Sequence, residues 1–177
     1  MSPVNSNEIS MRQIITFLLL IASIFNISAI ERYVSRPVSD GTLYFIMPKK
    51  LGEVSGAKSF LYDVTMVSGL DSATINFTVV SPLASEPSEL IIRSGSQLLE
   101  CDDSKLLFVD KSGKNFEIRV TSHFPKDKIE EIFSSTNIPQ FEFMIGDTPV
   151  SATYKPGAWK KDRLKMIEVF NLLKLMK

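Results

Sequence analysis

The chain offers very few side chains with which to build a metal-dependent or nucleophilic site. His123 is the only histidine and Cys101 is the only cysteine. A structural zinc site is held by four ligands, mostly Cys and His, so this composition excludes one. An oxygen-rich cation site around Asp102 and Asp103 remains conceivable, but this pair lacks the spaced carboxylates of a calcium loop and is typical of a solvated turn. We therefore predict no metal site and no cofactor.

Catalysis by a Ser-His-acid triad would depend on His123 alone, because the members of such a triad meet only in space. No G-x-S-x-G motif supports a triad, and a histidine close to Pro125 at the end of a predicted strand is typical of a surface or helix-entry residue. A string beginning at Gly52 resembles a phosphate loop, but Ala57 separates the second glycine from Lys58, and the string leads into a predicted strand. We predict no catalytic residue, and a small extracytoplasmic hydrolase that uses His123 is kept as an alternative.

The amino-terminal segment has the pattern of a secretory signal. Arg12 precedes an apolar run of 14 residues, Ile14 to Ile27, and the small residue Ala29 follows. A membrane-spanning helix requires roughly 18–20 apolar residues, so the run is short for that purpose. We predict that residues 1–29 are a cleavable signal peptide, that the chain is exported to the periplasm or the extracellular space, and that no transmembrane span remains after cleavage. An uncleaved anchor stays open.

The mature chain is expected to be one domain. Its 148 residues, 30–177, can bury about two thirds of their unfolded surface without a cross-link. One cysteine forbids an intramolecular disulfide, and so low a cysteine content suits a bacterial export product. We expect Cys101 to be a small buried hydrophobe, and pairing with another chain stays open.

Apolar residues alternate with polar ones in several segments, which indicates strands. The clearest pair joins 60–66 to 75–79 through turn residues 68–71. Three further hairpins are predicted, over 90–93 with 97–100, 106–110 with 116–121, and 141–145 with 150–154. We therefore predict an α+β domain of mostly antiparallel β structure, either a meander sheet or a two-sheet sandwich.

Two helices complete the predicted domain. A short one runs from Lys126 to Ser134, after a proline that suits the first turn of a helix. A longer amphipathic helix, 157–176, ends the chain and is expected to pack on the sheet. Its apolar face comprises Trp159, Met166, Phe170 and Leu173.

The end of the long helix provides the candidate binding residues. Leu172 and Leu175 fall on the otherwise charged side, so the last turns are apolar nearly all round. Such a helix either packs as part of the core or docks on another chain or a membrane surface. Its place at the chain terminus favours core packing, because a terminal helix commonly closes an open sheet. The candidate binding residues are Trp159, Phe170, Leu172 and Leu175. We favour an exported, non-enzymatic protein that binds another protein or a cell-envelope component through this helix, and a structural or oligomeric envelope protein is a further alternative.

Charge is distributed unevenly along a chain whose formal net charge is zero. Residues 30–154 hold 12 Lys and Arg against 17 Asp and Glu, whereas residues 155–177 hold 7 against 2. We expect the basic carboxyl-terminal segment to lie on the acidic body rather than to bind nucleic acid or a membrane surface.

Overall fold

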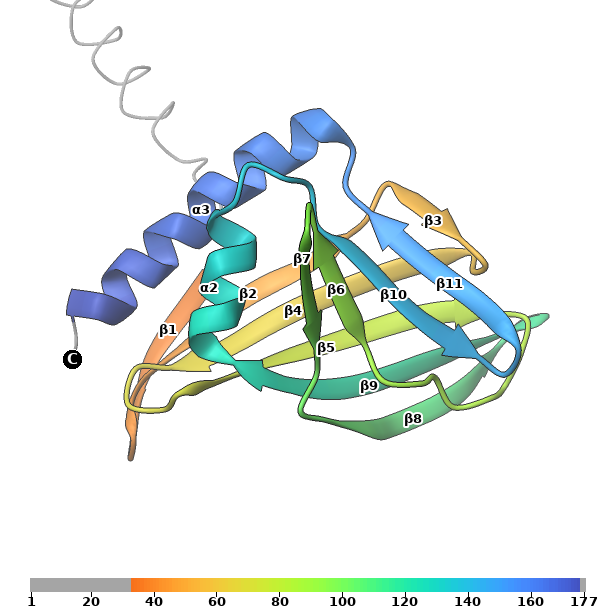
Figure 1. Cartoon of the computed structure of the whole chain (residues 1–177). Helices are drawn as coiled ribbons and strands as arrows, with labels where there is room; N and C mark the ends of the chain where they lie inside the picture. Colours follow the sequence, from red (N-terminus) through yellow and green to blue (C-terminus); the bar gives the residue numbers. More distant parts are fainter. Residues whose placement is uncertain (1–32, 176–177) are drawn as a thin grey trace, which may run out of the picture. The chain divides into compact units, whose positions relative to one another are not determined.

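The α+β class is confirmed by the computed structural model, which describes residues 33–175 (Figure 1). The predicted signal peptide and the predicted last helical residue, Met176, lie outside the described residues. The strands are β1 (Tyr33–Val38), β2 (Gly41–Lys50), β3 (Glu53–Ser55), β4 (Ser59–Val67), β5 (Ser72–Ser81), β6 (Ile91–Ser94), β7 (Gln97–Glu100), β8 (Asp103–Ser112), β9 (Asn115–Pro125), β10 (Gln140–Ile145) and β11 (Thr148–Thr153). The helices are α2 (Lys126–Ser134) and α3 (Pro156–Leu175).

The strands form two antiparallel sheets. The six-stranded sheet has the order β1-β2-β4-β5-β9-β8, and the five-stranded sheet has the order β3-β11-β10-β6-β7. The first four strands of the larger sheet form a meander that only the short β3 interrupts, and the chain then alternates between the sheets hairpin by hairpin. The structure thus combines the two predicted arrangements.

All four predicted hairpins are present in the structure. β4 pairs with β5, β6 with β7, β8 with β9, and β10 with β11, each antiparallel. Two-residue turns join β6 to β7 and β8 to β9, and their first residues, Gly95 and Gly113, have φ of 61° and 62°. Glycine adopts positive φ without a steric cost, which favours a two-residue turn at these positions.

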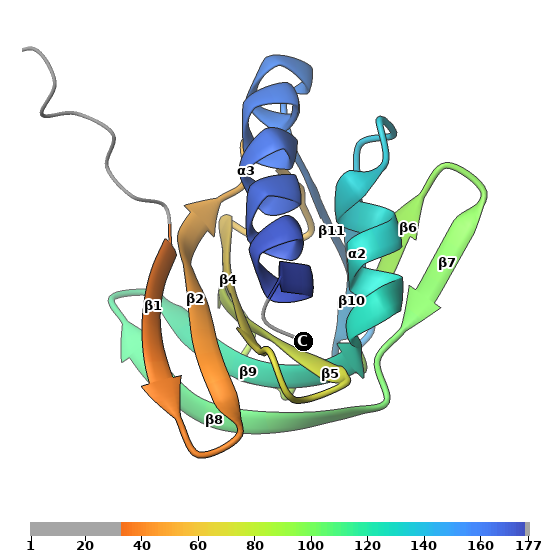
Figure 2. The same cartoon turned by 90° about the vertical axis from the view of Figure 1, so that its left-hand side faces the viewer.

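Aromatic side chains join the two sheets. Phe60 on β4 is fully buried, and its ring centroid lies 5.6 Å from that of Phe77 on β5. It lies 5.3 Å from Phe141 and 5.9 Å from Phe143, both on β10 of the other sheet. The inner face of the six-stranded sheet is thus covered by the smaller sheet in one part and by the helices in another (Figure 2).

The predicted apolar face of α3 is buried, as an amphipathic helix on a sheet requires. Its buried apolar residues are Trp159, Met166, Val169, Phe170 and Leu173. Polar contacts also hold the helix: Lys49 Nζ lies 2.9 Å from Asp162 Oδ2, and Arg163 Nη1 donates to the Ser134 carbonyl over 3.0 Å. The helix is therefore fastened to the body along much of its length.

Candidate functional site

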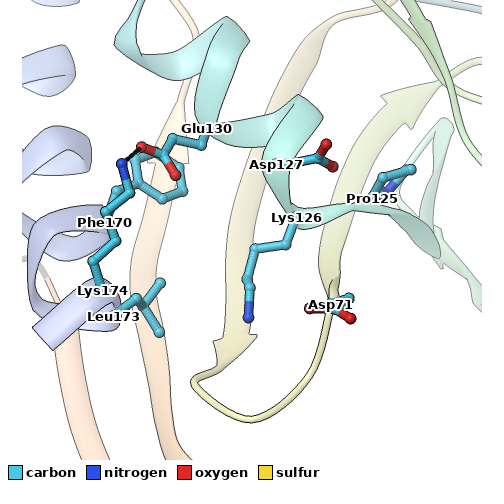
Figure 3. A pocket seen from close by; sticks show the side chains of 8 residues that line it. All are labelled: Asp71, Pro125, Lys126, Asp127, Glu130, Phe170, Leu173 and Lys174. Carbon is cyan, nitrogen blue, oxygen red and sulfur yellow. Dashed lines mark hydrogen bonds and ion pairs between the residues drawn. The ribbon is translucent and has the colours of Figure 1, made fainter. Parts of the chain in front are cut away.

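A cavity of about 420 Å³ lies between α2 and the last turns of α3, next to the turn from β4 to β5 (Figure 3). Its volume is within the range of small-ligand sites, about 300–1,000 Å³. The lining residues are Asp71, Pro125, Lys126, Asp127, Glu130, Phe170, Leu173 and Lys174. Three elements that are distant in sequence thus meet at one opening.

Lys126 fixes the turn beneath this cavity. Its side chain is buried, and its Nζ donates to the carbonyls of Val67 (3.1 Å), Ser68 (3.3 Å) and Leu70. Its backbone N–H donates to the Asp71 carbonyl over 2.8 Å. Because an ammonium group has three donors and these carbonyls are three acceptors, the first residue of α2 determines where the turn lies.

Replacing Lys126 with methionine is expected to lower the free energy of unfolding by about 1–3 kcal/mol, since three carbonyls, that of Ser68 in a buried hydrogen bond and the others in part-buried ones, lose their donor. Urea denaturation followed by circular dichroism measures the effect. Lys128→Met, on the exposed side of the same helix, is the matched control and should change stability by about 0.5 kcal/mol or less. Equal stability of the two variants would contradict the anchoring role of Lys126.

Only some of the charged side chains around the cavity have a partner of opposite charge. Lys174 Nζ lies 2.5 Å from Glu130 Oε1, so one ion pair joins α3 to α2 at the opening. The carboxylates of Asp71 and Asp127 are exposed and make no ion pair or hydrogen bond within residues 33–175. Phe170 adds an apolar wall. The arrangement therefore combines apolar surface with two unpaired negative charges.

The four candidate binding residues occupy different environments. Trp159 and Phe170 are each 2 % exposed, and Leu172 is partly buried against the core. Leu175 is 83 % exposed. Sequence reasoning missed Leu164, which is 56 % exposed. Its position among lysines on the charged side of the helix was the available signal.

Ser72 of β5 shares the outer face of the six-stranded sheet with His123, but it lies opposite Pro125 and makes no hydrogen bond to His123 within residues 33–175. His123 itself lies beside an acid. Its Nδ1 is 2.5 Å from Asp103 Oδ1, with side chains 43 % and 70 % exposed. The neighbouring residues Ser122 and Ser104 share a 2.7 Å hydrogen bond, and they point to the opposite face because successive residues of a strand alternate. Cys101 is free and buried. Within the described residues no group of three or more His, Cys, Asp or Glu could hold a metal ion.

Neither a protein-family model, nor a curated protein, nor a solved structure matches this chain. Function must therefore be inferred from the chemistry of the described residues. Neither α2 nor α3 is both long enough and apolar enough to cross a membrane.

Proposed function

We propose that the protein is exported and non-enzymatic, and that it binds another protein or a component of the cell envelope through α3. The signal pattern of residues 1–29 supports export. The observation that carries the binding role is the exposure of two large apolar side chains, Leu164 (56 %) and Leu175 (83 %), on a helix most of whose other apolar side chains pack into the body. Leu164 and Leu175 are 11 residues apart, about three helical turns, so both lie on the same side of α3 and can contact one partner surface.

The charges beside Leu164 indicate the kind of partner surface that would fit. Lys160 and Lys161 are exposed and form no ion pair in the described part of the chain. Lys165 is paired only within the helix, with Glu168 at 3.2 Å. Basic groups around an apolar side chain favour a partner with acidic groups, which would increase both the association rate and the specificity.

Site-specific photo-crosslinking in a bacterial host tests this proposal. A photoreactive residue in place of Leu164 or Leu175 is expected to give an adduct in the extracytoplasmic or envelope fraction. Leu98 on β7 and Leu107 on β8, which are 50 % and 47 % exposed, are the matched control positions and should give none. The same material should begin at Ile30 on amino-terminal sequencing.

Four outcomes would overturn parts of the proposal. Adducts that are equally frequent at all four positions, or absent from all, would contradict the role of α3. An adduct with twice the mass of the chain would show that the partner is a second copy of the chain, and it would favour the oligomeric alternative. Full-length protein that still carries Met1 and stays in the cytosol would contradict export.

A further inference from the structure

We infer that the cavity between α2 and α3 receives a basic side chain, lysine or arginine, from a partner polypeptide. This inference rests on the proposed binding role of α3 and adds the chemistry of the group that is bound. Its basis is the combination of an apolar wall, unpaired carboxylates and neighbouring exposed leucines at one opening.

The interior of the cavity suits the aliphatic part of such a side chain. Phe170 and Leu173 line it from α3 but are only 2 % and 4 % exposed, so each presents a small, well-packed apolar area. Pro125 and the methylene groups of Lys174 complete the apolar part of the lining. Long basic side chains bury their methylene groups against surfaces of this kind and keep the charged end in a polar environment.

The charges favour a cation over an anion. Both positive side chains at the cavity are already engaged, Lys126 by three carbonyls and Lys174 by Glu130. The carboxylates of Asp71 and Asp127 are not engaged by any described residue. The carboxyl-terminal end of α3 and the amino-terminal end of α2 both border the cavity, and their partial charges are of opposite sign. The preference for a cation therefore rests on the unpaired carboxylates.

The Glu130–Lys174 ion pair opposes the binding of a cation in the cavity. An incoming ammonium or guanidinium group would compete with Lys174 for Glu130, whose carboxylate is 29 % exposed. Removing the positive charge of Lys174 should therefore improve binding of a cation. A site for an anion would respond in the opposite direction.

Exposed apolar side chains next in sequence to two lining residues favour a polypeptide over a small free amine. Leu70 is 41 % exposed and precedes Asp71, and Leu175 is 83 % exposed and follows Lys174. Residues that flank a bound basic side chain could cover these two leucines, whereas a single small amine would leave them in water.

Titration of the mature protein with the acetylated and amidated tripeptide Leu-Lys-Leu, followed by NMR of the Leu173 methyl groups, tests the inference. The peptide is expected to bind more tightly than its analogue with norleucine in place of lysine, and more tightly than n-butylamine. Asp127→Asn should weaken binding about 2- to 5-fold, as expected for the loss of one solvent-accessible ion pair. Lys174→Met should strengthen it by a similar factor.

Matched controls separate local charge from changes in net charge or folding. Asp147→Asn, in the turn between β10 and β11, and Lys105→Met, on β8, change exposed residues away from the cavity lining and should leave affinity unchanged. Equal binding of the lysine and norleucine peptides, or weaker binding by the Lys174 variant, would overturn the inference. Binding of n-butylamine as tight as that of the peptide would overturn the assignment to a polypeptide.

The peptide titration and the crosslinking experiment can fail independently, so a failure of the cavity assignment can be told apart from a failure of the proposed function. If crosslinks form at position 164 while the peptides fail to bind, the role of α3 stands and the cavity assignment is wrong. If the peptides bind with the expected charge dependence but position 164 gives no adduct, the exposed face of α3 is not the docking surface and the cavity assignment stands.

Discussion

Replacing Phe60 with alanine is expected to lower the free energy of unfolding by about 3–5 kcal/mol. The side chain is fully buried on β4 and lies against Phe141 and Phe143 of the other sheet. Its removal would leave a cavity where the two sheets meet, which the surrounding strands can fill only in part. Urea unfolding should show a lower midpoint with an unchanged denaturant dependence.

Phe45→Ala is the matched control for this prediction. Phe45 lies on β2 of the same sheet but is only half-buried and points to the outer face. We expect a loss of about 1 kcal/mol or less, as is usual for substitutions away from the core. A similar loss in both variants would contradict the central role of Phe60 in joining the sheets.

Strands with one face in the core were predictable because burial leaves a period of two in the sequence. On β4, Tyr62 and Val64 face the core and are buried, whereas Leu61 and Thr65 face the other side and are partly exposed. Glycine at the turns then set the pairing of neighbouring strands. Local pattern and tertiary burial agree in these hairpins, so the sequence alone was sufficient.

β1 and β2 were not predicted from the sequence, and there is a different physical reason for each omission. β2 contains five consecutive apolar residues, Leu43 to Met47, because the outer-face residues Leu43 and Phe45 are partly buried too, and this removes the alternation. β1 is an edge strand with both faces largely exposed, and Pro37 interrupts its pattern. Exposed edge strands leave little hydrophobic periodicity to read.

The contact between His123 and Asp103 could not be foreseen either. A register shift between Leu106 and Phe108 inserts one extra residue into β8. Without that bulge, Asp103 would lie opposite Phe124, because a shift of one residue moves a side chain to the other face of the sheet. The shift instead places Asp103 opposite His123.

The cavity was invisible in the sequence for a different reason. Asp71, Asp127 and Lys174 belong to a turn and to two different helices, and no spacing rule relates them. Only the tertiary arrangement brings them together. The sequence did indicate that the last turns of α3 were apolar on more than one side, which points to the same end of the helix.

Arg119→Met is expected to lower the free energy of unfolding by about 3–5 kcal/mol, because it leaves a buried carboxylate without its cation. Asp63 on β4 is 1 % exposed although it points to the outer face of the sheet. Its Oδ2 accepts a hydrogen bond from Arg119 Nη2 over 2.6 Å, and its Oδ1 accepts one from Asn76 Nδ2 over 2.7 Å. Arg119 Nη1 also donates to Thr78 Oγ1 over 2.8 Å.

The double variant Asp63→Val/Arg119→Met separates the two possible sources of this loss. If the cost is an unpaired buried charge, removing that charge as well should restore most of the stability, since apolar replacements of buried ion pairs are often neutral or stabilising. If the cost is lost packing of the arginine stem, the double variant should be at least as unstable as Arg119→Met. A double-mutant cycle in urea gives the coupling energy directly, and a coupling near zero would contradict the charge interpretation. Since the cluster ties β4, β5 and β9 together on the outer face, a large coupling would also show that both faces of the central strands stabilise the six-stranded sheet.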